Sequence, residues 1–119
     1  MPIYPSKRNW LGSYRSAFND FKPRLANLRL RIDDLAHQVN YNSENRSYRY
    51  GPLREILGNQ KMTLTKALNY FEALSRNATE EVKTTDEYRE CLKFIEGIQL
   101  YIERVGLLSR VVNQRIEGK

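Results

Sequence analysis

The chain is short of the residues that cross-link proteins and bind metals, because its 119 residues include one cysteine and one histidine. Cys91 by itself excludes an internal disulfide, and together with His37 it is too little for a Cys/His zinc site. We therefore expect no metal, no other cofactor and a reducing intracellular compartment.

Long hydrophobic runs are also absent. No uninterrupted apolar stretch approaches the roughly 18 to 20 residues that span a bilayer, so we expect no membrane span. Residues 1–19 lack the apolar core of a secretory signal. They contain Lys7, Arg8 and Arg15 and no acidic residue, so import into an organelle remains compatible with the sequence.

Catalytic motifs are missing as well. The sequence has no glycine-rich phosphate loop, no nucleophile elbow and no carboxylates at metal-binding spacing. Asp33 and Asp34 are adjacent, so on a helix their side chains point in different directions and do not form a carboxylate pair. We expect a protein that is not an enzyme.

What the chain does contain is a heptad stripe, in which apolar residues recur at alternating spacings of three and four. This pattern is typical of helices that pack along seams, and it predicts helices over residues 9–39, 52–76 and 84–116. We expect one all-α domain, an elongated antiparallel three-helix bundle. An irregular basic arm should occupy residues 1–8, and a loop should occupy residues 40–51.

Local signals refine these helices. Asn9 is a suitable N-cap for the first helix, and Pro52 suits the first turn of the second. The segment Thr84–Glu87 has the spacing of a capping box, with Thr84 as the cap and Glu87 reaching back. Pro23 falls inside the first helix, but the stripe keeps its phase across it, which favours a kink or a near-continuous junction over a split.

The third helix carries more apolar surface than one seam requires. Some of that surface needs a cover, which favours a homo-oligomer or docking within a larger assembly. The residues that we assign to this interface are Phe94, Leu100, Tyr101, Leu107 and Leu108.

The net charge of +6 is confined to one half of the sequence. Residues 1–54 hold ten basic and four acidic side chains, whereas residues 55–119 hold ten of each. Such asymmetry is a hint of a nucleic-acid or other anionic partner. A basic face that meets an acidic protein would produce the same asymmetry.

Two basic segments are candidate sites. On a heptad, cations of the first helix fall at the e and g positions that border the seam, where arginine can bind phosphate bidentately. The loop before the second helix interleaves cations with tyrosines, which stack on unpaired bases. The predicted nucleic-acid-binding residues are Lys7, Arg8, Arg15, Lys22, Arg24, Arg29, Arg31, Arg46, Tyr48, Arg49 and Tyr50.

These features favour a nucleic-acid-binding helical bundle with little sequence preference, of the kind found in viral and mobile-element proteins, and they leave RNA and DNA as equal candidates. The alternative is a helical scaffold or accessory subunit that docks on another protein through its apolar third helix. A small helical enzyme is the weakest of the three interpretations, because no catalytic motif supports it.

Overall fold

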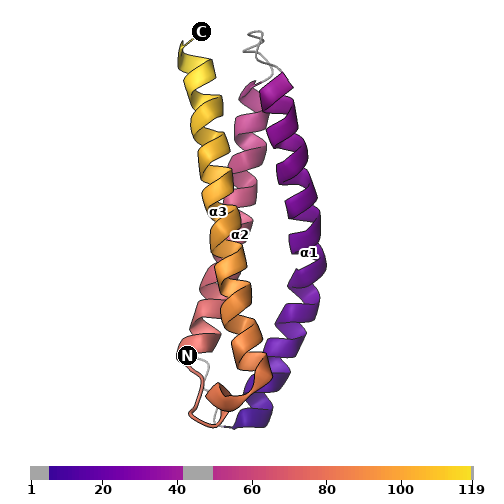
Figure 1. Cartoon of the computed structure of the whole chain (residues 1–119), viewed down its shortest axis with the longest axis vertical. Helices are drawn as coiled ribbons and strands as arrows, with labels where there is room; N and C mark the ends of the chain where they lie inside the picture. The colour runs from indigo at the N-terminus through magenta and orange to yellow at the C-terminus, as the bar shows by residue number, and fades with distance from the viewer. Residues whose placement is uncertain (1–5, 42–49, 119) are drawn as a thin grey trace.

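The protein is an elongated all-α bundle in a computed structural model that describes residues 6–41 and 50–118. Its helices are α1 (Lys7–Tyr41), α2 (Tyr50–Arg76) and α3 (Asp86–Gly118), with a 3₁₀ turn, η2 (Val82–Thr84), before α3. The molecule measures 56 × 23 × 18 Å, and its three long helices run side by side along the longest dimension (Figure 1). The predicted three-helix bundle is confirmed.

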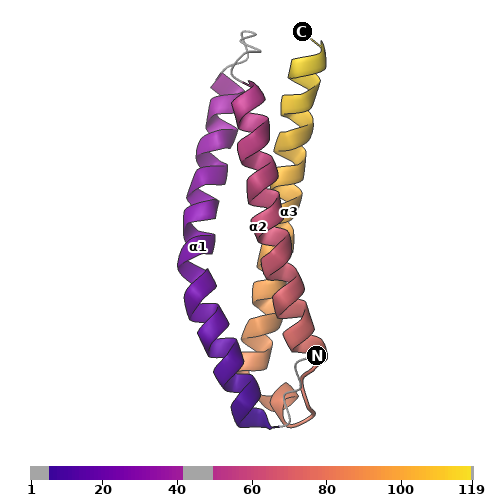
Figure 2. The ribbon, with the colours of Figure 1, turned by 180° about the vertical axis from the view of Figure 1, so that it is seen from behind.

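The helices are not equally close to one another. The helices α2 and α3 form the most tightly packed pair, and α1 lies along both with fewer close approaches. Views from opposite sides show α1 bowing outward between its two ends (Figures 1 and 2). The bundle is therefore a close α2–α3 hairpin with a more loosely attached first helix.

The first helix begins two residues earlier than the sequence predicts. The hydroxyl of Ser6 accepts a hydrogen bond from the Asn9 amide at 3.1 Å, and the Ser6 carbonyl accepts from the Trp10 amide, also at 3.1 Å. Ser6 is thus the N-cap, and the assignment of that role to Asn9 was wrong. Serine and asparagine are about equally good caps, so local preference could not separate them.

The predicted capping box of α3 is also wrong. The hydroxyl of Thr85, one residue further on, accepts from the Tyr88 amide at 3.1 Å. Thr84 belongs to η2, and its hydroxyl donates to the Glu81 carbonyl at 2.8 Å. The carboxylate of Glu87 pairs with Arg15 on α1, so it is engaged between helices.

Pro23 lies inside α1, which continues through it. Phe21 and Ile32 are both buried, so the helix keeps the same face toward the bundle on either side of the proline. The ends of α1 are tied down by hydrogen bonds. Near its start, the Trp10 indole donates to the Leu74 carbonyl at 2.7 Å, and near its end Arg115 donates to the Val39 carbonyl.

An aromatic cluster attaches the N-terminal half of α1 to the α2–α3 hairpin. Phe94 of α3 is the centre of several contacts, with ring centroids 4.9 Å from Phe18, 5.0 Å from Phe71 and 6.1 Å from Phe21. Edge-to-face and offset pairs at such distances are favourable beyond the area they bury. The rings of the cluster are those of Trp10, Tyr14, Phe18, Phe21, Phe71 and Phe94.

Two titratable groups are buried in this core. Burial raises the pKa of the Tyr14 hydroxyl, and its 2.6 Å hydrogen bond to Glu90 raises it further. Burial likewise raises the pKa of the Cys91 thiol, to about 11. Cys91 is 0% exposed and behaves as a small core residue.

Candidate nucleic-acid interface

The cations of α1 lie along two different edges of the helix. One edge carries four exposed cations, each seven residues from the next, which we call the basic row: Arg8, Arg15, Lys22 and Arg29. At 1.5 Å per residue, the row is about 31 Å long. It runs along the side of α1 that approaches α3, because Arg15 reaches Glu87 of that helix.

Three cations of the basic row are free of acidic partners among the residues that the structure describes. Arg15 is the exception, since its guanidinium lies 2.7 Å from the Glu87 carboxylate. This hydrogen bond holds the pKa of Glu87 below its usual range. The ammonium group of Lys22 lies 5.4 Å from the centroid of the Phe18 ring, which is within cation–π distance.

Acidic groups mark the limits of the row. Asp33, four residues beyond Arg29, pairs with Arg104 of α3 at 2.8 Å. At the other end, Lys7 and Arg8 line a shallow hollow of about 430 Å³, which Glu81 also borders. The exposed positive charge of the row is therefore concentrated between these two places.

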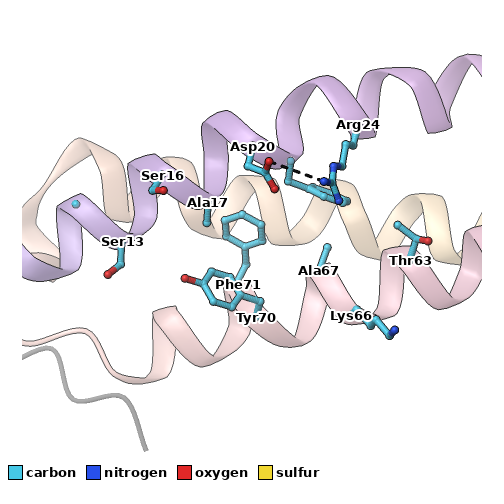
Figure 3. Close-up of a pocket in the computed structure, with 12 residues that line it drawn as sticks. Ser13, Ser16, Ala17, Asp20, Arg24, Thr63, Lys66, Ala67, Tyr70 and Phe71 are labelled. Atoms are coloured by element: carbon cyan, nitrogen blue, oxygen red, sulfur yellow. Dashed lines mark ion pairs between the residues drawn. The ribbon is translucent and has the colours of Figure 1, made fainter.

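The other edge of α1 faces α2 across an open groove. Its wide part, shown in Figure 3, has a volume of about 980 Å³, and its narrow part has a volume of about 420 Å³. We refer to both parts together as the α1–α2 groove. Arg24 lines both parts, and Arg31, one heptad further on, lines the narrow part. Arg24 is only loosely paired, 3.9 Å from Asp20, and both side chains are well exposed.

The walls of the groove combine apolar, hydroxyl and basic groups. Ala17 and Phe21 of α1 and Ala67 and Phe71 of α2 line the wide part, and Lys66 adds a cation from α2. Thr63 lines both parts, and Ser13 and Ser16 border the wide one. Such a surface suits an amphipathic helix better than it suits a row of phosphates, because half of it is apolar.

Gln60 lines the narrow part of the groove, and sequence reasoning did not assign it to a site. Its side chain is almost fully buried, and its amide oxygen has no hydrogen-bond partner among the described residues. The signal in the sequence was a polar residue at a core position of the heptad stripe. Lys66 was missed for another reason, because nothing in the sequence shows that it faces α1.

The predicted interface of α3 divides into two groups. Phe94, Tyr101 and Leu108 pack against the core of their own chain. Leu100 and Leu107 remain 57% and 56% exposed. Helix α1 therefore covers part of the apolar surface of α3 for which the sequence predicted a binding partner.

Some predicted residues fall elsewhere. Arg46, Tyr48 and Arg49 lie outside the described residues, and Tyr50 is the first residue of α2. In the segments 6–41 and 50–118, no three His, Cys, Asp or Glu side chains gather closely enough to hold a metal ion. None of the helices there has both the length and the apolar character needed to cross a membrane.

Comparison with protein-family models, with curated proteins and with solved structures finds no match to this chain.

Proposed function

We propose that the protein is a nucleic-acid-binding helical bundle that contacts phosphates through the basic row of α1. The observation that carries the proposal is the alignment of four cations on one helix edge, three of them without an acidic partner in the described part of the chain. Cations in this arrangement attract a polyanion along the whole helix and release its condensed counterions on binding.

The chemistry of the row predicts little sequence preference. Its arginine and lysine side chains donate hydrogen bonds, as phosphate oxygens require, and contacts to phosphate carry no direct sequence information. Arg46, Tyr48 and Arg49 belong to the same proposal, because their sequence suits stacking and phosphate contact with an unpaired strand.

The test is a salt titration of binding to labelled single-stranded and duplex oligonucleotides, followed by fluorescence anisotropy. For a single strand, each neutralised phosphate makes the slope of log affinity against log salt steeper by about 0.7, so the four cations of the basic row together contribute about −2.8. Changing Lys22 and Arg29 to glutamine should therefore make the slope less steep by about 1.4.

The matched control changes Arg24 and Arg31 to glutamine. This pair has the same spacing on the same helix and removes the same charge, but it lines the α1–α2 groove. It should leave the slope near its original value. Equal losses in the two variants would mean that net charge alone causes binding, and the proposed site would be wrong.

A second candidate function is a scaffold or accessory subunit, and the open α1–α2 groove favours it. The groove offers apolar walls and three cations to an acidic helical segment. Indifference to both kinds of oligonucleotide at low salt would favour this function over the first.

A further inference from the structure

The face of α3 that points away from the other two helices carries a short amphipathic stripe. Leu100 and Leu107 follow the buried Ile98 and Val105 by two residues, which places them about 200° around the helix from the core. Among the exposed large apolar side chains of the described residues, these two leucines are the one pair separated by a heptad.

Two exposed glutamates accompany the leucines. Glu96 stands four residues before Leu100, and Glu103 stands four residues before Leu107, so each lies one helical turn from its leucine. We call these four residues the α3 stripe. Arg104 is the remaining charged residue of the segment, and it is directed to Asp33 of α1. Between Glu96 and Leu107, the outward face of α3 therefore carries two acidic groups beside two exposed leucines.

The α1–α2 groove has the complementary pattern. Arg24 and Arg31 are separated by seven residues, as are Glu96 and Glu103. Arg24 stands where the wide and narrow parts of the groove meet, and Arg31 borders the narrow part. A helix that carries two glutamates seven residues apart can therefore meet both cations along one edge of the groove.

We propose that the α1–α2 groove of one molecule receives the α3 stripe of a second copy of the same chain. Glu103 lies opposite Arg24 and Glu96 lies opposite Arg31. In this register Leu107 enters the wide, apolar part of the groove, and Leu100 enters the narrow part beside Leu28. The docked helix runs antiparallel to α1 and parallel to α2, which completes a four-helix arrangement over the open groove.

The geometry also determines the type of assembly. The groove lies between α1 and α2, whereas the stripe lies on the far side of α3, so one molecule can use both surfaces at the same time. An interface of this kind is heterologous, and it adds copies side by side until the arrangement closes into a ring or continues as an open array. The association should therefore grow with protein concentration and weaken with salt.

The test uses charge reversal in protein washed free of nucleic acid at high salt, so that bound nucleic acid does not bridge the copies. One variant carries R24E and R31E, and the other carries E96R and E103R. Each variant should associate at least about tenfold more weakly than the original chain, because like charges then meet at the interface. Light scattering on a size-exclusion column, over a wide range of protein concentration, measures the mass.

Mixing the two variants in equal amounts provides the decisive result. Each reversed surface then finds its opposite on the other variant, and association should return to its original strength. A matched control carries K22E and R29E, which have the same spacing and charge change on the other edge of α1, and it should associate normally.

Three outcomes would overturn the proposal: an original chain that is monomeric at every concentration, variants whose mass is unchanged, or a mixture that does not recover. Circular dichroism of each variant checks that helicity is retained. Self-association and nucleic-acid binding are tested separately, because R24E/R31E changes only the groove and K22E/R29E changes only the basic row.

Discussion

Phe94 provides the sharpest test of how the bundle is held together, because sequence and structure assign it different roles. The sequence places it on a surface between molecules, whereas the structure places its ring between Phe18 and Phe71 of the same chain. Its replacement by alanine should therefore destabilise the isolated molecule, and it should do so at any protein concentration.

The magnitude follows from these contacts. Truncating a fully buried phenylalanine costs about 3–5 kcal/mol, and Phe94 is only partly buried, so the lower end of about 3 kcal/mol applies. In a domain of this size, that loss corresponds to a fall in melting temperature of about 12 °C. Leu92, on the same helix and 39% exposed, is the control, and its replacement by alanine should cost about 0.5 kcal/mol or less.

Urea unfolding followed by far-UV circular dichroism measures both losses as free energies of unfolding. Equal effects of the two substitutions would refute the assignment of Phe94 to the intramolecular core. A Phe94→Ala variant with unchanged stability but a reduced molecular mass on light scattering would restore the intermolecular role.

Three further predictions concern individual side chains. Gln60→Leu should raise the free energy of unfolding by about 1 kcal/mol, because it removes a buried amide oxygen that has no partner among the described residues. A lower free energy of unfolding in urea would show that this oxygen is hydrogen-bonded in solution. Since burial raises the pKa of Cys91 from near 9 to about 11, the unfolded thiol loses its proton first as the pH rises, so stability should fall across this interval by up to about 1.4 kcal/mol per pH unit. The melting temperature of Cys91→Ala should therefore depend less steeply on pH across that interval. The same pH dependence in both proteins would contradict this reasoning. The Arg15–Glu87 pair should contribute less than about 1 kcal/mol in a double-mutant cycle, since both side chains reach solvent, and the contribution should vanish as the pH falls through the lowered pKa of Glu87.

The heptad pattern was enough to predict the fold class and the number of helices. Burying one stripe on each helix leaves few alternatives to a bundle, and most stripe positions, such as Phe21, Ile32 and Ile98, are buried in the structure. Helix ends were less predictable. Ser6 and Asn9, like Thr84 and Thr85, are chemically similar caps, and only the path of the preceding turn decides between them.

The sequence was enough to predict which side chains are candidates for a site, but it did not predict how the fold groups them on the surface. The heptad positions show that Lys22 and Arg24 border the seam of α1, but they do not show which neighbouring helix each edge approaches. The neighbouring helix is what distinguishes the two sites, because the basic row lies on the side of α1 near α3 and the groove lies between α1 and α2. Likewise, periodicity identified Phe94 and Leu100 as surplus apolar residues of α3, but it could not show that α1 covers only the first.

Pro23 links the shape of α1 to the surface beside it. A proline in the interior of a helix removes one backbone hydrogen bond and costs about 3 kcal/mol, and helices bend at such residues. Pro23 is exposed on the outer side of α1, where a bend carries the middle of the helix away from α2 and α3 while its two ends remain attached. We expect that a straight α1 would lie closer to α2 and narrow the α1–α2 groove. Pro23→Ala should therefore stabilise the helix and reduce the proposed docking surface without changing any residue that lines it.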